Sequence, residues 1–258
     1  MKLIPKMLSL AIFSAGLTAC VSTASLNQEA AQSYAQVKQQ ASAQRAIDTS
    51  SATARKVHAV FNKMKPYAEK ANKTGVPFQW EIIVIKSDEL NAWAMPGGKM
   101  AFYTGLVEKL HLSDDEIAVV MGHEMAHALQ EHGKSDRTVS TITGIASEIG
   151  KVALASKGIS TNLGGFDAVD VLTEYGLNKP FSRSQETDAD EVGLFLMAEA
   201  GFNPEAAPNV WTKMSQATGG SGGALEAIAS THPTNEDRQQ NLQRLVPKAK
   251  EIYLASKK

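Results

Sequence analysis

Two histidines that stand four residues apart, His123 and His127, constrain this chain more than any other feature of its sequence. In a helix, residues at that spacing lie on one face, so both imidazoles can turn toward a single cation. Glu124 then projects about 100° away from His123 and can serve as a base beside that cation. The segment HEMAH at 123–127 therefore predicts a helix that binds zinc and positions a carboxylate.

The residues before this segment support a helix beneath it. Ser113-Asp114-Asp115-Glu116 has the pattern of a capping box, in which the side chains of Ser113 and Glu116 each accept from the other's backbone amide. Apolar residues follow at helical spacing, and Gly133 offers a C-terminal stop. The alternative is a pair of solvated histidines on an ordinary amphipathic helix.

A catalytic zinc site needs a third protein ligand and a fourth position left for water. The chain has one cysteine, so this ligand must be a histidine or a carboxylate. A second predicted helix, at about 184–200, offers Glu186, and Asp190 shares its face and could accept a hydrogen bond from a ligand imidazole. Asp188 and Glu191 point elsewhere on that helix. The alternative is a solvated acidic face that stabilises the helix start.

Three of the four other histidines have no place in this group. His132 follows His127 by five residues, off the metal-facing stripe, and we expect it to be a cation stabilised by the helix C-terminus. His58 and His111 are expected at the surface.

The segment before the HEMAH helix has the pattern of a small sheet. Residues 78–86 (FQWEIIVIK) are β-branched and aromatic, which predicts a strand. Residues 92–95 and 99–103 flank Pro96-Gly97-Gly98 and predict a hairpin. The expected fold class is α+β, with a small sheet or hairpin before a mainly helical body. The strand edge at 93–95 either pairs with an extended peptide or only supports the helix.

The first twenty residues have the organisation of an export signal. Two lysines precede an apolar stretch at 7–17 that is too short to span a bilayer. Leu17-Thr18-Ala19-Cys20 resembles the lipobox of bacterial lipoproteins, in which the cysteine is acylated and becomes the mature first residue. We expect removal of residues 1–19 and a lipid anchor at Cys20 in the outer membrane. The alternative is an incidental cysteine near an ordinary cleavage site.

The rest of the chain divides by composition. Residues 20–50 are rich in Ala, Gln and Ser, which predicts a tether that frays as a helix and builds no core. Residues 51–258 are expected to form the folded domain. Within it, residues 134–180 are Gly-, Ser- and Thr-rich and predict either a lid over a cleft or a variable surface insertion. The net charge of -1 gives no basic field for a nucleic acid, so we expect no nucleic-acid partner.

The two motifs together resemble those of a known family. HEMAH, followed across an insertion by Glu186-Thr187-Asp188-Ala189-Asp190, is similar to the HExxH plus ExxxD pattern of the HtpX-like zinc metallopeptidases. This gluzincin family also contains the CaaX prenyl-protein endopeptidase. The resemblance extends to NAWAMPGGKMAFYTGL at 91–106, to Thr231-His232-Pro233 and to Arg238. Because of its lipobox, the chain most resembles the family's periplasmic lipoprotein branch.

The resemblance implies a zincin-like fold, one zinc ion per chain and a role for each matching residue. The implied zinc ligands are His123, His127 and Glu186, the base is Glu124, the residue that orients a ligand is Asp190, and the oxyanion donor is His232. The alternative for His232 is a turn histidine before Pro233. Arg238 either fixes that segment or is a surface charge.

Two functions follow as expectations. The first is a lipid-anchored zinc endopeptidase at the periplasmic face of the outer membrane, which cleaves misfolded or misassembled envelope proteins. Its partners would be periplasmic protein or peptide substrates and, in addition, the outer-membrane assembly machinery. The second is a chaperone-like assembly factor that binds outer-membrane protein clients with little proteolysis. A passive lipoprotein spacer fits poorly with a complete candidate zinc site.

Overall fold

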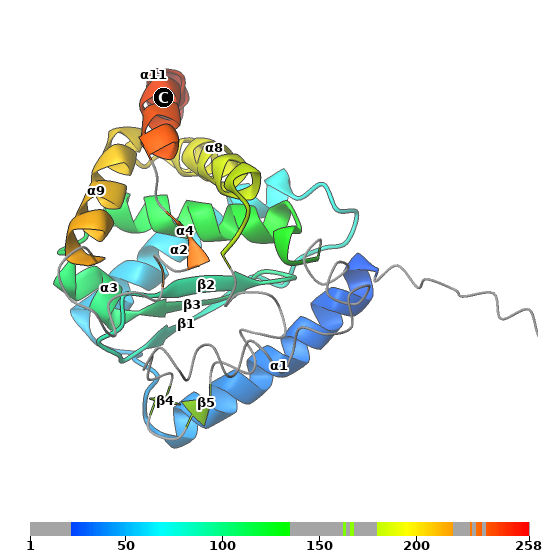
Figure 1. Ribbon diagram of the computed structural model, residues 1–258. Coiled ribbons are helices and arrows are strands. Elements are labelled where there is room, and N and C mark those ends of the chain that lie inside the picture. Colours follow the sequence, from blue (N-terminus) through cyan, green and yellow to red (C-terminus); the bar gives the residue numbers. More distant parts are fainter. Residues whose placement is uncertain are drawn as a thin grey trace, which may run out of the picture.

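The computed structural model describes residues 22–134, 162–163, 166–167, 180–218, 228, 231–233 and 236–257. In this part of the chain, helices surround a small three-stranded sheet (Figure 1). The elements, in chain order, are α1 (Thr23–Ala43), α2 (Ala52–Ala71), β1 (Glu81–Ile85), β2 (Ala92–Met95), β3 (Lys99–Tyr103), α3 (Thr104–Lys109), α4 (Asp114–Leu129), β4 (Asn162–Leu163), β5 (Phe166–Asp167), α8 (Arg183–Glu199), the 3-10 helix η1 (Pro204–Ala206), α9 (Ala207–Thr218) and α11 (Glu236–Ala255). The predicted α+β class, with a small sheet before the HEMAH helix, is confirmed.

The sheet has the strand order β1-β3-β2, so β2 forms one edge. β1 runs parallel to β3, whereas β2 and β3 form the predicted antiparallel hairpin. Its turn needs glycine, because Gly97 and Gly98 have φ values of 76° and 82°. A Cβ atom on Gly98 would also lie 2.6 Å from the Trp80 ring. The predicted strand at 78–86 is shorter in the structure and begins at Glu81.

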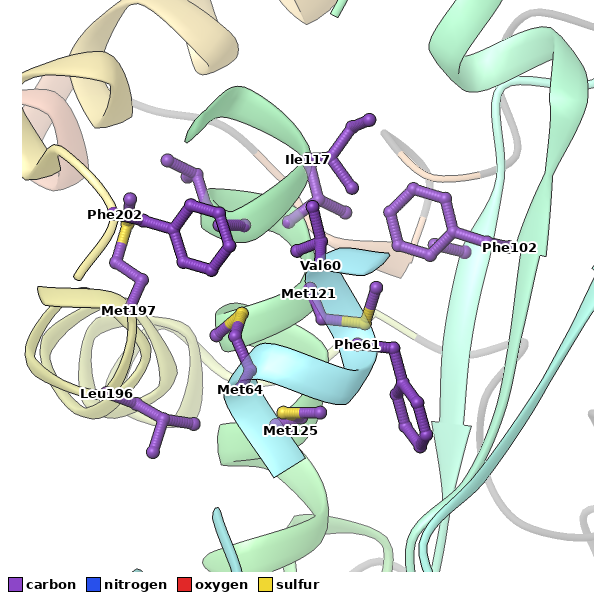
Figure 2. Close-up of a cluster of buried hydrophobic side chains, with 14 of the residues drawn as sticks. Val60, Phe61, Met64, Phe102, Ile117, Met121, Met125, Leu196, Met197 and Phe202 are labelled. Carbon is purple, nitrogen blue, oxygen red and sulfur yellow. The ribbon is translucent and has the colours of Figure 1, made fainter. Parts of the chain in front are cut away.

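The main hydrophobic core lies between one face of the sheet and the helices α2, α4 and α8. Figure 2 shows side chains from these helices and from β3 meeting in one cluster. Its labelled members are Val60, Phe61, Met64, Phe102, Ile117, Met121, Met125, Leu196, Met197 and Phe202. Burial of this apolar surface holds α4 and α8 against each other, and these two helices carry the predicted metal ligands.

Helix α1 covers the opposite face of the sheet (Figure 1), so the prediction of a tether without a core is wrong for residues 23–43. Its buried residues recur at helical spacing and are mostly small or apolar: Leu26, Ala30, Tyr34, Val37 and Ala41. The hydroxyl of Tyr34 donates to the carbonyl of Met100 at 3.0 Å, and Lys38 forms an ion pair with Glu81. The alanines let the helix approach closely, and the sheet supplies the apolar partner that the segment lacks on its own.

Helices α4 and α8 approach each other at a pair of glycines. A Cβ atom on Gly122 would lie 2.6 Å from the carbonyl oxygen of Gly193, and one on Gly193 would lie 2.6 Å from the carbonyl carbon of Gly122. Both distances are far below van der Waals contact, and each clash is with backbone. This close approach sets the separation between His123, next to Gly122, and the acidic face of α8.

Replacing Gly193 with alanine should therefore destabilise the protein by about 1 to 3 kcal/mol, the usual cost of overpacking a core. Urea unfolding followed by circular dichroism measures this difference. Glu199→Ala, an exposed position on the same helix, is the control and should change the free energy of unfolding by about 0.5 kcal/mol or less. Equal stability of the wild type and Gly193→Ala would contradict the close contact.

Several predicted segments lie outside the described residues. They include the signal at 1–19, Cys20, and the candidate lid at 134–180 apart from its ends and the two short strands β4 and β5. Among the helices that the structure does describe, none is long and apolar enough to cross a membrane.

Candidate metal centre

Helix α4 begins as predicted. Ser113 accepts a hydrogen bond from the Glu116 amide at 3.3 Å, and Glu116 accepts one from the Ser113 amide at 2.9 Å, which confirms the capping box. The helix continues through Leu129 and buries both of its histidines, His123 and His127, which are 2% and 3% exposed. The alternative of two solvated histidines is therefore excluded by their burial.

Four buried side chains from three segments converge at one point. His123 and His127 come from α4, Glu186 comes from α8, and His232 comes from the segment before α11. One ligand atom from each of these residues lies within 4.8 Å of all the others. The Nε2 atoms of His123 and His127 are 3.1 Å apart, and the two Glu186 oxygens lie 3.4 Å from His127 Nε2 and 3.5 Å from His123 Nε2.

The chemistry of this group suits zinc. Two imidazoles and a carboxylate are a common ligand set of catalytic zinc sites. Oε1 of Glu124 is buried without a hydrogen-bond partner in the described structure, whereas Oε2 of Glu186 forms an ion pair with Nη1 of Arg238 at 2.5 Å. Unpaired buried carboxylate oxygens are costly unless a cation or a ligand satisfies them. The residues present therefore fit a zinc ion held by His123, His127 and Glu186.

Neighbouring imidazoles control the charge of the carboxylate in this group. Burial alone would raise the pKa of Glu186, but the neighbouring His123 and His232 hold it well below its usual value. Burial lowers the pKa of His127 well below its usual value. A carboxylate and a neutral imidazole are the forms that bind a metal ion.

Asp190 lies one helical turn after Glu186 and contacts the other side of His123. Its Oδ1 is 3.0 Å from His123 Nδ1. Arg238 donates to both oxygens of Asp190, from Nε and Nη2, at 2.7 Å each. Burial opposes the charge on Asp190, but Arg238 and His123 keep its pKa below the usual range. Asp190 thus presents an ionised carboxylate to Nδ1 of His123, the ring nitrogen that faces away from the other proposed metal ligands.

Arg238 is a buried residue, which resolves the alternative that the sequence left open. It is 3% exposed, donates to the carbonyl of Pro233 at 3.0 Å, and its guanidinium lies 4.4 Å from the centre of the Trp211 ring. It therefore joins the His-Pro segment to Asp190 on α8. The charge is stabilised by two carboxylates and an aromatic face rather than by solvent.

Glu124 is enclosed between the sheet and His232. It is 2% exposed and accepts a hydrogen bond from the backbone amide of Ala94 on the edge strand β2, while its Oε1 lies 3.4 Å from His232 Nε2. Burial raises the pKa of Glu124, and the nearby His232 and His123 offset this only in part. A raised pKa makes a carboxylate a better proton acceptor.

His232 lies inside the group and not on a surface turn. Its Nδ1 is 2.9 Å from Glu186 Oε1 and 3.1 Å from His123 Nε2. Burial would lower the pKa of His232, but the carboxylates Glu124 and Glu186 raise it. The backbone fixes the segment, because the Phe181 amide donates to the carbonyl of Thr231 at 3.1 Å.

The prediction that His132 is a cation stabilised by the helix C-terminus is wrong, because burial lowers its pKa. The chain leaves α4 after Leu129 and turns back at Glu131, which has a φ of 53°, so the helical spacing no longer applies. This turn buries His132 with its Nδ1 2.9 Å from Nδ1 of His127. Burial lowers the pKa of His132, against the opposing effect of Asp188. The contact between His132 and His127 was not predicted from the sequence. Its one sequence signal is a histidine placed shortly after the end of the helix.

A small pocket opens beside the group. Its lining includes Ala94 and Pro96 of the hairpin, His127, Phe181 and, from α1, Leu26. The Phe181 ring stacks on His127 with a centroid distance of 4.0 Å. The pocket therefore joins the edge of the sheet to the metal ligands. His58 is partly exposed, His111 is exposed, and neither lines this pocket.

A family model and similar known proteins both indicate a metallopeptidase. Peptidase family M48 matches residues 51–246. The mitochondrial metalloendopeptidase OMA1 of Schizosaccharomyces pombe is 37% identical over 175 residues, which are 66% of this chain and 48% of that protein. The metalloproteases LoiP and YcaL of Escherichia coli are 28% and 25% identical over 171 residues each, 66% of this chain and 64% and 63% of theirs. The chain thus spans about half of this OMA1 and less than two thirds of LoiP and YcaL.

The family match includes the HEMAH segment, the acidic helix α8, His232 and Arg238. The same residues form the buried group in the structure. The predicted relation to the HtpX-like zinc metallopeptidases is confirmed, and with it zinc as the cofactor of the family. This chain belongs to peptidase family M48.

Proposed function

We propose that this chain is a zinc-dependent endopeptidase that cleaves protein or peptide substrates, with Glu124 as the general base. The observation that carries the proposal is the buried group of His123, His127, Glu186 and His232 beside a carboxylate whose Oε1 has no hydrogen-bond partner in the described structure. A structural metal site would not need such a base at its border. The names of the relatives, metalloendopeptidase and metalloprotease, support the same class.

His123, His127 and Glu186 would hold the zinc ion, which when bound lowers the pKa of a water molecule and polarises the substrate carbonyl. Glu124 takes the proton from the attacking water and later passes it to the leaving amine. Its carboxylate is held for this task by the Ala94 amide on one oxygen, which leaves Oε1 available.

We assign His232 as the donor to the oxyanion rather than as a fourth ligand. A catalytic site keeps one position open, and four protein ligands would close it. His232 Nε2 lies on the side of Glu124, at 3.4 Å from its Oε1, and so faces the place where the proton is handled. The carboxylates that raise its pKa favour the protonated form, in which this nitrogen donates.

The edge strand β2 is proposed to pair with an extended substrate. Ala94 and Pro96 border the pocket that also contains His127, so a peptide along this edge would pass the metal ligands. Pairing through the backbone gives affinity without selecting particular side chains. The wall of this small pocket includes the apolar side chains of Phe181 and Leu26.

Metal removal tests the proposed activity. We expect the purified protein to cleave casein, to lose this activity when a chelator removes zinc, and to regain it when one equivalent of zinc is restored. Cleavage followed by fluorescence of a labelled casein, together with zinc content by elemental analysis, measures both effects. Magnesium, which prefers oxygen ligands, is the control and should not restore activity. Full cleavage by metal-free protein would contradict the proposal.

We further propose that the peptidase, including helix α1, works at the periplasmic face of the outer membrane, anchored through Cys20 after removal of residues 1–19. Its substrates there would be misfolded or misassembled envelope proteins, with the outer-membrane assembly machinery as a partner. The support is the charged and apolar start of the chain and the lipobox-like segment before Cys20. The OMA1 relatives are named as mitochondrial, so this location rests on the first twenty residues.

Cys20→Ser should move the protein from the membrane fraction to the soluble fraction, because acyl chains on that residue would provide the anchor. Fractionation of cells that express the full chain, followed by immunoblotting, measures the distribution. Ser22→Ala, two residues further along, is the matched control and should stay with the membranes. Unchanged sedimentation of Cys20→Ser would exclude the lipid anchor without affecting the proposed chemistry.

A further inference from the structure

The two metal-facing histidines of α4 have different outer partners. The Nδ1 atom of His123 faces a carboxylate, Asp190, at 3.0 Å. The Nδ1 atom of His127 instead faces the imidazole of His132, at 2.9 Å between the two Nδ1 atoms. The rings of His127 and His132 meet edge to face at a centroid distance of 4.9 Å. His132 is 8% exposed and thus largely removed from competing water.

A second carboxylate stands behind His132. Its Nε2 lies 3.3 Å from Oδ2 of Asp188, which comes from α8 between Glu186 and Asp190. Gln130 donates to the same oxygen at 2.7 Å and so holds the Asp188 side chain in place. The acidic helix therefore supports both metal-facing histidines, with Asp190 directly behind His123 and Asp188 behind His127 through His132.

The positions of the protons follow from this chain of contacts. His127 can offer the lone pair of Nε2 to a cation only if its proton is on Nδ1. That N–H then donates to Nδ1 of His132, which places the proton of His132 on Nε2, where it faces Asp188. The opposite arrangement would put a proton on His127 Nε2, directed at His123 and Glu186, and would block the metal position.

We propose that His132 and Asp188 are positioning residues that fix the orientation and the tautomer of His127 for zinc. This inference rests on the proposed zinc site and adds to it a histidine and a carboxylate that contact no substrate. Outer partners of this kind orient the ligand and raise its basicity, and their loss typically weakens metal binding by about 10- to 100-fold.

The segment that carries His132 is held from both sides, as a positioning residue requires. Thr23 of α1 donates to Glu131 at 2.6 Å, and Lys134 donates to Thr23 at 2.8 Å. On the other side, Gln185 of α8 donates to the carbonyl of His132 at 3.4 Å. Helix α1, which precedes the family match at 51–246, thus helps to fix the turn after α4.

Zinc affinity of the full chain, measured by competition with a chromophoric chelator, tests the inference directly. We expect His132→Ala to raise the dissociation constant about 10- to 100-fold, and His132→Asn, which can still accept from His127 through its amide oxygen, to recover most of the loss. Asp188→Ala, at a side chain that is 44% exposed, should weaken binding several-fold. His111→Ala, on an exposed histidine, is the control and should bind as the wild type does.

A double-variant cycle separates positioning from a general structural effect. Because Asp188 acts through His132, the loss of Asp188 in the His132→Ala background should cause no further change in zinc affinity. Additive effects of the two substitutions, or wild-type affinity in both Asp188→Ala and His132→Ala, would overturn the inference. If the wild type bound no zinc, both the proposed function and this inference would fail. If the wild type bound zinc and the variants showed additive effects or wild-type affinity, only this inference would fail.

Discussion

Glu124→Gln should reduce casein cleavage by about 10²- to 10⁴-fold, the range that a positioned general base contributes. The amide has the shape of the carboxylate and can still accept from the Ala94 backbone, so the fold is retained. It cannot take a proton from the attacking water, however. Because Glu124 is 2% exposed, bulk water does not easily replace it as the base. Initial rates of cleavage at matched zinc occupancy measure the difference.

The zinc content of Glu124→Gln should equal that of the wild type, since Glu124 is outside the group of proposed ligands. Glu191→Gln on α8 is the control, because that glutamate is next to Asp190 in sequence but outside the buried group. Equal cleavage by Glu124→Gln would remove the proposed mechanism. Rescue of a deletion strain by the inactive variant would favour the alternative of a chaperone-like factor that binds clients and cleaves rarely.

Arg238→Met should destabilise the protein by about 3 to 5 kcal/mol, the cost of breaking a buried ion pair from one side. Methionine fills much of the space of the arginine stem but leaves the Asp190 carboxylate buried without its two donors. The loss also removes the contact with Pro233 and with it the support of the segment that carries His232. Denaturant unfolding of the metal-free protein measures the free energy.

A second substitution tests whether uncompensated charge is the cause. Asp190→Asn combined with Arg238→Met removes the charge of Asp190 as well and should recover part of the lost stability, while Glu186 still lacks its ion pair with Arg238. Arg244→Met, at an exposed arginine of the same helix α11, is the control and should change stability by about 0.5 kcal/mol or less. A loss of under 1 kcal/mol in Arg238→Met would contradict the importance of the pair.

Local patterns were sufficient for much of this protein. The capping box at Ser113 and Glu116 gave the start of the metal-binding helix because capping depends on residues three apart. The glycines after Pro96 gave the hairpin because a tight turn needs positive φ at fixed positions. The spacing of His123 from His127 is likewise a local quantity, since both residues share one helix.

Other residues could not be interpreted without their partners in space. The segment 23–43 has few large apolar side chains. Only the structure shows that these are enough to pack the helix against the face of the sheet. His132 is off the metal-facing stripe in sequence, and only the backbone turn at Glu131 brings it into contact with His127. For Arg238, the sequence has no signal that distinguishes a surface charge from a buried one, because its partner Asp190 is 48 residues away.

The sequence by itself determined which residue types stand at which helical positions: the HEMAH spacing, the acidic face of α8, the caps and the turn. Only the tertiary structure decided which of these groups meet, because that depends on how closely the elements approach. Helices α4 and α8 come together at Gly122 and Gly193, where the absence of Cβ atoms allows backbone contact. That contact brings His123 to Glu186 and Asp190, and their burial makes the charges interact strongly.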